Sequence, residues 1–181
     1  RHLFRMAHEH DHYTAGTRRV IVDIKGWKVR PLVCYDLRFP VWSRNQPGEG
    51  ACDILLYVAN WPERRRYAWQ TLIKARAIEN LSYCIAVNCV GKDGNGINYS
   101  GDSAAVDYLG QPMTEASDRE FVTTVTLDRA ALRAFRDKLR NAAFRIVHIT
   151  EEDRSSRTRG GAGLELMAGR ALPGVEALQD K

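Results

Sequence analysis

The residue best suited to chemistry is Cys34, which ends an apolar segment and is followed at once by a polar turn. The apolar residues before it, 29–33, predict a short strand, so the thiol lies where a strand gives way to a turn or a helix start. Backbone N–H groups cluster at such a point, and the positive end of a following helix favours a thiolate. The position therefore predicts a nucleophile with a lowered pKa, whereas the residue type alone favours an inert, buried thiol.

A run of potential metal ligands lies near the N-terminus, at His8, Glu9, His10, Asp11 and His12. The three histidines would share one face of a strand, and His8 and His12 would share one face of a helix. A stable metal site also needs supporting partners and a closed geometry, which five adjacent residues seldom supply. We therefore expect solvent-facing or substrate-gating histidines here, with no metal and no cofactor.

Short strands and two helices are the elements available to position Cys34. Apolar residues alternate or run continuously in six segments that we predict as strands: 20–24, 27–34, 53–59, 83–90, 104–107 and 121–127. The first two flank a Lys-Gly pair and predict a hairpin. Apolar residues recur at helical spacing from 63 to 81, and Asp128 can cap a second helix over 129–140.

The end of the chain has a different character. Residues 142–150 favour a short strand, whereas residues 151–181 are rich in arginine and glycine, with weak periodicity. That composition buries too little apolar surface to offset the entropy of ordering. We therefore predict a domain over residues 1–140 and a divergent, largely disordered tail over 141–181.

Composition narrows the classes of function. The 181 residues are 44% hydrophobic, which suits one folded domain, and no apolar run approaches the ~20 residues of a membrane span. A net charge of +5 could suggest nucleic acid, but basic residues are scattered among acidic ones and do not alternate with aromatic residues. Four cysteines without paired metal spacing favour free thiols in a reducing compartment. We expect a cytoplasmic protein that binds neither nucleic acid nor a membrane.

Four ordered segments resemble the nitrilase superfamily, the carbon–nitrogen hydrolases. The segment around the cysteine, which is similar to the nucleophile signature of that superfamily, reads Cys34-Tyr35-Asp36-Leu37-Arg38-Phe39-Pro40. The others follow in the family's order: Tyr57-Val58-Ala59-Asn60-Trp61-Pro62, then Ala75-Arg76-Ala77-Ile78-Glu79-Asn80, then Gly101-Asp102-Ser103. Residues 32–45, together with 60–62, are most similar to the bacterial omega-amidase branch. The resemblance covers residues 1 to 138.

The resemblance implies a fold and a catalytic set. The family fold is α/β, a four-layer α-β-β-α sandwich, of which this chain would form the C-terminal part. Family members use a glutamate as general base, a lysine at the oxyanion and a cysteine nucleophile, and only the cysteine is found here, as Cys34. Residues 1–4 resemble the stretch that directly follows the family's lysine, so we expect the lysine and the general base to precede Arg1. A second family glutamate, which supports the lysine and the substrate amide, falls on Glu9.

The implied reaction is amide hydrolysis through a cysteine thioester. Cys34 attacks the amide carbon, the backbone N–H of Tyr35 helps to hold the oxyanion, ammonia leaves, and water then releases the acid. In the omega-amidase branch the substrates are the ω-amides 2-oxoglutaramate and 2-oxosuccinamate, and the products are 2-oxo dicarboxylates.

Three further residues are candidates for substrate binding. Such anionic substrates need a cation, for which Arg38 is the candidate, although an ion pair with Asp36 or Glu79 is an equal alternative. Asn60 and Trp61 follow the buried strand at its carboxyl end, where they would line the pocket beside the cysteine.

Other functions stay open. Without the general base and the lysine the chain is expected to be inactive, and it could then be an inactive remnant or a binding and assembly module of the same fold. An amidase of the same superfamily with another substrate is the second alternative. Family members usually dimerise through helices of one outer layer, so we expect a homodimer or a larger homo-oligomer for the complete protein.

Overall fold

The computed structural model describes residues 2–45 and 51–152, with side chains as far as residue 140. The chain divides into two compact units, Arg1–Ala134 and Phe135–Lys181, and each is described by itself. The first unit holds both sheets and all of the candidate site residues. No helix within the described residues is both long enough and apolar enough to cross a bilayer.

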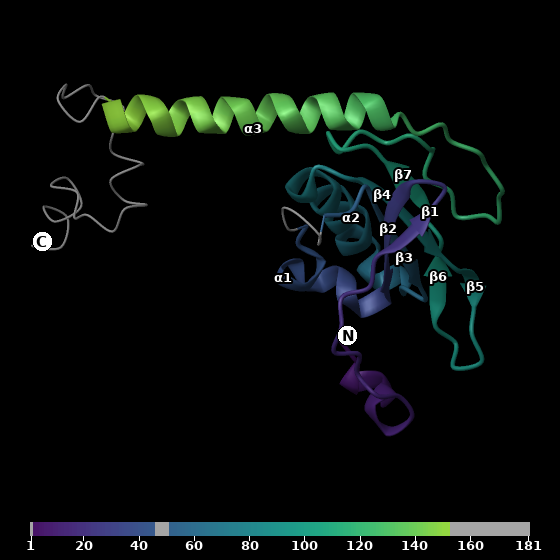
Figure 1. The fold of residues 1–181 in the computed structure, drawn as a ribbon. Coiled ribbons are helices and arrows are strands. Elements are labelled where there is room, and N and C mark those ends of the chain that lie inside the picture. Colours follow the sequence, from purple (N-terminus) through teal and green to yellow (C-terminus); the bar gives the residue numbers. More distant parts are fainter. Residues whose placement is uncertain (1, 46–50, 153–181) are drawn as a thin grey trace, which may run out of the picture. The chain divides into compact units, whose positions relative to one another are not determined.

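A five-stranded mixed sheet forms the centre of the first unit (Figure 1). Its strands are β1 Val22–Ile24, β2 Trp27–Val33, β3 Ile54–Ala59, β4 Tyr83–Asn88 and β7 Ala104–Val106. They pair in that order; the central three are parallel and each edge strand is antiparallel to its neighbour. The carboxyl ends of β2, β3 and β4 therefore meet at one edge of the sheet, which is where open α/β sheets bind ligands.

Helical segments connect these strands. A 3₁₀ turn, η3 Cys34–Arg38, follows β2 directly and leads into α1 Pro40–Ser43. Between β3 and β4 the chain forms the 3₁₀ turn η5 Glu63–Arg65 and the long helix α2 Arg66–Asn80. The remaining elements are the 3₁₀ turns η1 Arg5–Ala7 and η2 Glu9–Asp11, the ribbon of β5 Val90–Lys92 and β6 Asn98–Ser100, and α3 Arg129–Glu152.

Two apolar cores lie on the two faces of the sheet because successive strand residues point to opposite sides. The core between the sheet and α2 includes Leu55, Tyr57, Cys84, Trp69 and Ile73. The core on the other face includes Val29, Ile54, Tyr83 and Leu132. Alternate burial along β3 and β4 thus fixes the register of the strands, and with it the level at which their carboxyl ends stop.

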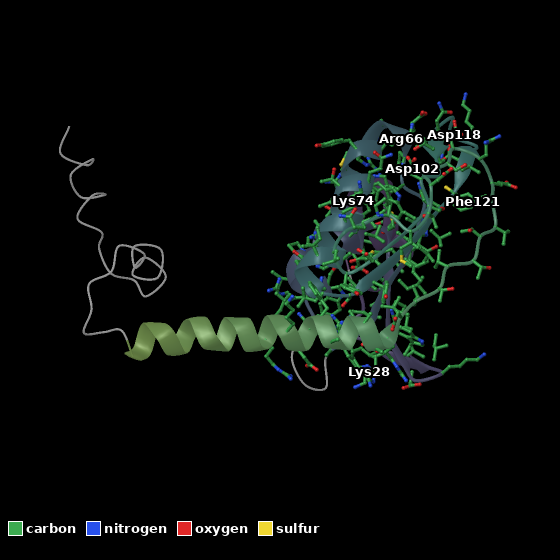
Figure 2. All side chains as sticks on the ribbon, turned by 90° about the horizontal axis from the view of Figure 1, so that it is seen from above. Lys28, Arg66, Lys74, Asp102, Asp118 and Phe121 are labelled. Atoms are coloured by element: carbon green, nitrogen blue, oxygen red, sulfur yellow. The ribbon has the colours of Figure 1, made fainter. Side chains whose placement is uncertain are left out.

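The first residue of α2 is tied to a buried carboxylate. Arg66 Nε lies 2.6 Å from Asp102 Oδ2, and Arg66 Nη2 donates to Oδ1 at 2.9 Å (Figure 2). The side chain of Asp102 is only 1% exposed, and the hydroxyl of Ser100 donates to it as well. The indole N–H of Trp69 donates to the Asp102 carbonyl oxygen at 2.9 Å. These contacts attach the segment after β6 to the start of α2.

Most predicted strands are confirmed with shorter bounds, whereas the helix predicted over 129–140 extends to residue 152. The hairpin forms at the Lys-Gly pair, where Lys25 and Gly26 both have positive φ, and Ile24 pairs with Trp27. The strand predicted over 83–90 is divided into β4 and β5. Asp128 caps α3, since its Oδ1 accepts the N–H of Ala131 at 2.9 Å.

Two predicted strands are wrong. Residues 121–127 form no strand in the described chain, because they have no neighbouring strand to pair with, and Val122 is fully exposed. Residues 142–150 belong instead to α3, because no glycine or proline interrupts the helix that begins at residue 129. Residues 153–181, where most of the tail predicted to be disordered falls, lie outside the described residues.

Candidate active site

The predicted site residues meet in one cleft. A cavity of about 940 Å³ lies at the carboxyl ends of β2, β3 and β4. Its lining includes every candidate from the sequence: Glu9, Cys34, Tyr35, Arg38, Asn60 and Trp61. Residues far apart in the chain converge there because each follows or faces a parallel strand end.

Cys34 is the first residue of η3 and makes a sharp turn directly after β2. Its φ is +36°, a left-handed conformation that few residues other than glycine adopt, and such backbone strain concentrates at functional sites. The turn brings the thiol to the cleft, where Cys34 Sγ lies 3.9 Å from the carbonyl oxygen of Asn60 and can donate to it. The side chain is half-buried, so a small reagent can still reach it.

The predicted lowering of the Cys34 pKa is wrong for the chain as described. Burial disfavours the thiolate and raises the pKa above the ordinary thiol value, and the nearby charge of Glu9 adds to this effect. The hydrogen bond to Asn60 and the charge of Arg65 act in the opposite direction without cancelling it. The 3₁₀ turn that follows Cys34 is only five residues long, so it offers no long aligned helix dipole to stabilise a thiolate.

Asp36 anchors the turn that presents Cys34. Its Oδ2 accepts the backbone N–H of Val33 at 3.1 Å, and its Oδ1 accepts the backbone N–H of His2 at 3.0 Å. Burial by itself would raise the pKa of this carboxyl, but hydrogen bonds from His2 and Val33 lower it below its usual range. Asp36 thus joins the N-terminal segment to the residue directly before the cysteine.

Glu9 lies at the cleft through η2. Its Oε2 accepts the backbone N–H of Phe4 at 2.7 Å, and the carboxylate acts electrostatically on Cys34. The neighbouring histidines contact acidic side chains instead of one another's ring nitrogens: His8 Nδ1 lies 3.2 Å from Asp11 Oδ2, and His10 Nε2 lies 3.4 Å from Asp11 Oδ1. Within the described part of the chain, no group of three or more ligating side chains is arranged to hold a metal ion.

Arg38 does not adopt either of the ion pairs considered from the sequence. Asp36 pairs with His2, and Glu79 pairs with Arg76 at 3.1 Å. The guanidinium carbon of Arg38 instead lies 5.0 Å from the ring centroid of Trp61, within cation–π range. Arg38 is therefore directed to the cleft.

Asn60 and Trp61 differ in their roles. Asn60 presents its carbonyl oxygen to the cysteine, whereas Trp61 is buried and its ring packs against Trp69 with centroids 5.5 Å apart. The Trp61 indole N–H donates to the carbonyl oxygen of Arg65 at 2.9 Å. Trp61 is therefore a rigid wall that orients neighbouring arginines, and only part of its surface faces the cleft.

Tyr35 lines the cleft, and its ring is held by two aromatic neighbours. The ring contacts Phe4 and Phe39, each with ring centroids 5.0 Å apart. These aromatic contacts fix the peptide that joins Tyr35 to Cys34, which is the peptide whose N–H the resemblance assigns to the oxyanion.

Two residues of the site were not found from the sequence. Asn88, the last residue of β4, accepts the Trp61 backbone N–H at 2.6 Å and donates to the carbonyl oxygens of Trp61 and Gly101. Arg65 lies in the cleft with its guanidinium carbon 5.3 Å from the ring centroid of Phe4. Asn88 lies at the end of a predicted strand, and this position could have identified it as a site residue. Arg65 lies among three consecutive arginines, and the sequence does not distinguish it from the other two.

The comparisons with known proteins agree with this geometry. A family model described as "Carbon-nitrogen hydrolase" matches residues 1–137. Omega-amidase YafV of Escherichia coli K12 is 54% identical over 140 residues, which are 76% of this chain and 53% of that protein. A 2-oxoglutaramate amidase of Bacillus subtilis is 35% identical over 127 residues, 70% of this chain and 48% of that protein. The chain thus spans about half the length of the relatives it matches.

A solved structure supports the fold. XC1258 from Xanthomonas campestris, a CN-hydrolase superfamily protein solved with an arsenic adduct in its active site, is 53% identical with a TM-score of 0.72. The alignment covers 76% of this chain and 54% of that one. The predicted α/β fold of the carbon–nitrogen hydrolase type, of which this chain forms a part, is confirmed by this similarity. With the family model matching most of its length, the chain belongs to the carbon–nitrogen hydrolases, the nitrilase superfamily.

Proposed function

We propose that this chain carries the nucleophile half of an omega-amidase, which hydrolyses the ω-amide of 2-oxoglutaramate or 2-oxosuccinamate. The observation that carries the proposal is the convergence of Cys34, Glu9 and Arg38 in one cleft at the strand ends. The 54% identity to an omega-amidase and the 35% identity to a 2-oxoglutaramate amidase support the same substrate class.

The reaction proceeds through a thioester. Cys34 loses its proton to a general base and its sulfur attacks the amide carbon, so that a C–S bond forms and the carbonyl becomes an oxyanion. The Tyr35 N–H donates to that oxyanion. The oxyanion then collapses, the C–N bond breaks, and the amide nitrogen takes the proton held by the general base and leaves as ammonia. Water attacks the thioester, the C–S bond breaks, and the acid and the thiol are released.

Two groups of this mechanism come from the family resemblance and not from the described residues. A glutamate would act as general base, and a lysine would hold the oxyanion together with Tyr35. Glu9 would support the lysine and the substrate amide; its contact with the Phe4 N–H holds the carboxylate at the cleft. A lysine ammonium beside Cys34 would also offset the effect of burial and bring its pKa down.

An assembly module of the same fold is a second candidate, favoured by one observation. Val33, Val58 and Val87 pair with one another across β2, β3 and β4, and they are 60%, 50% and 49% exposed. Such an apolar row on a sheet face favours association with another part of the protein or another chain. This alternative predicts binding without amide turnover.

The test joins residues 1–181 behind the N-terminal half of the Escherichia coli relative and measures ammonia release from 2-oxoglutaramate. We expect turnover by the joined protein and none by the 181-residue chain, because removing members of a catalytic unit removes most of its acceleration. Cys34→Ala should abolish activity in the joined protein, and Cys52→Ala, at a buried cysteine outside the cleft, is the matched control. A folded joined protein that releases no ammonia from 2-oxoglutaramate, 2-oxosuccinamate or simple amides would favour the assembly module.

Domain limits, location and oligomeric state are also part of this proposal. We propose that residues 1–140 form the hydrolase part and that residues 141–181 are dispensable for catalysis. Truncating the joined protein after residue 140 tests this division. The four free cysteines support a cytoplasmic location, which microscopy of a tagged protein tests. Exposed Tyr67 and Ile78 on α2 support a homodimer through that helix, which light scattering tests.

A further inference from the structure

Three arginines share the cleft with Cys34. Arg38, Arg64 and Arg65 all line it, and they arrive from two elements, η3 and η5. Arg38 and Arg64 are exposed, whereas Arg65 is half-buried, and Arg38 lies against the Trp61 ring. The cleft thus concentrates positive charge at the level of the thiol.

The charges of Arg38 and Arg65 are not neutralised by the protein within the described residues. Other arginines of the chain have acidic partners: Arg66 pairs with Asp102, and Arg76 pairs with Glu79. Among the side chains that the structure describes, no carboxylate lies within 4 Å of the guanidinium of Arg38 or Arg65. Two neighbouring arginines that lack an acidic partner in a cleft favour the binding of an anionic ligand.

Aromatic rings hold both guanidinium groups in place. The Arg65 guanidinium carbon lies 5.3 Å from the ring centroid of Phe4 and 6.0 Å from that of Trp61, and the Arg38 carbon lies 5.0 Å from Trp61. Hydrogen bonds with Asn88 hold the backbone of Trp61, so both arginines lie against a ring whose position is fixed. A guanidinium held over a ring can still use its in-plane N–H groups to bind a carboxylate in a fork.

We propose that Arg38 and Arg65 together form a carboxylate-binding subsite that makes the cleft selective for amides with a distal carboxylate. This inference rests on the proposed function and adds Arg65 as a specificity-determining residue. The substrate carboxylate would bridge the two guanidinium groups while its amide carbon lies at the thiol.

Electrostatic coupling between Arg65 and the thiol agrees with this placement. The charge of Arg65 acts to lower the pKa of Cys34, although burial outweighs it. The pKa of Arg65 is in turn lowered by burial and by the charges of Arg64 and Arg38. An anion bound among the arginines relieves this mutual repulsion, so its binding is favoured beyond a single ion pair.

The first test uses the 181-residue chain and requires no turnover. Iodoacetate and iodoacetamide alkylate a thiolate by the same displacement, but only iodoacetate is charged. The ratio of their rates at Cys34 therefore measures how strongly the surrounding charges attract an anion. The fraction of thiolate affects both rates equally and does not change the ratio. We expect Arg65→Gln to lower the iodoacetate-to-iodoacetamide ratio about fivefold. Arg38→Gln should lower it similarly, the double variant should lower it further, and added salt should lower it in the unmutated chain.

Controls separate charge from folding. Arg65→Lys keeps the charge and should retain most of the ratio, and Arg119→Gln removes an exposed charge outside the cleft and should leave it unchanged. Circular dichroism identifies any variant that fails to fold. If Arg65→Gln fails to fold, the salt dependence of the ratio in the unmutated chain tests the local charge, and Arg65→Lys in the joined protein tests the loss of the fork. Equal ratios for the unmutated chain, Arg65→Gln and Arg38→Gln would overturn the subsite.

The second test uses the joined protein and distinguishes this inference from the proposed function. Arg65→Gln should raise the KM for 2-oxoglutaramate about tenfold and should lower kcat/KM for this substrate much more than for a neutral aliphatic amide. An equal loss on both substrates would overturn the selective role of Arg65. If the joined protein hydrolyses neither substrate while the alkylation ratio still depends on Arg65, the proposed function fails and the anion subsite stands.

Discussion

The imidazole Nδ1 of His2 lies 2.9 Å from Oδ1 of Asp36, two residues after the candidate nucleophile. The His2 ring also stacks on Phe39 with centroids 3.5 Å apart, and Phe39 follows the same turn. The N-terminal segment and the turn at Cys34 are therefore one packed unit, although they are separated by two strands in the chain.

Asp36→Asn should reduce the free energy of unfolding by about 1–3 kcal/mol. The amide oxygen can accept only one of the two N–H groups, of His2 or of Val33, and the amide NH₂ would then face the other N–H group. Urea denaturation at neutral pH measures the change. The folded pKa of Asp36 is lowered, so the stability that this carboxylate adds is present at neutral pH and is lost as the pH falls below about 4. The difference between the two proteins should therefore shrink in acid, and a difference that persists unchanged at low pH would contradict the role of the charge.

Alkylation of Cys34 in the 181-residue chain should be slow at neutral pH. Burial raises the pKa of the thiol, so the rate with iodoacetamide should still be increasing above about pH 9. Peptide mapping by mass spectrometry follows the modified residue, and Cys34→Ala provides the blank. In the joined protein, where the resemblance supplies a lysine, the same profile should move to lower pH; a profile already flat at neutral pH in the chain alone would contradict the effect of burial.

Asn88→Ala should lower the free energy of unfolding by about 2–3 kcal/mol, because the buried Trp61 N–H and the carbonyl oxygens of Trp61 and Gly101 lose their partner. The urea midpoint measures the loss. Asn95→Ala is the matched control, since Asn95 is exposed and only its backbone N–H makes a hydrogen bond, to Asp93. Equal midpoints for the two variants would show that Asn88 does not hold the cleft wall.

Arg66→Gln should destabilise the protein more than Asp102→Asn. The first change leaves a buried carboxylate without its cation, whereas the second leaves a partly exposed guanidinium that water can solvate. Thermal unfolding followed by circular dichroism ranks the two variants. The reverse order would mean that Asp102 is important for its hydrogen bonds to Ser100 and Arg66 and not for its charge.

The sequence alone determined most local structure and the identity of the nucleophile candidate. Apolar alternation located β2, β3 and β4, helical spacing located α2, and the end of an apolar run located Cys34 at a strand end. These properties depend on residues that are neighbours in the chain, which is why pattern and propensity suffice. Where a segment needed a distant partner, as residues 121–127 did for strand pairing, the same patterns were wrong.

Only the tertiary structure decided the electrostatics of the site. The pKa of Cys34 depends on burial and on Glu9 and Arg65, which lie 25 and 31 positions away in the chain. Of the three consecutive arginines, Arg65 lies against the rings of Trp61 and Phe4, and this placement depends on the turn η5 and on rings that come from other parts of the chain. Burial and charge act through space, so residues far apart in the chain set them together, and only their positions in the folded protein reveal the result.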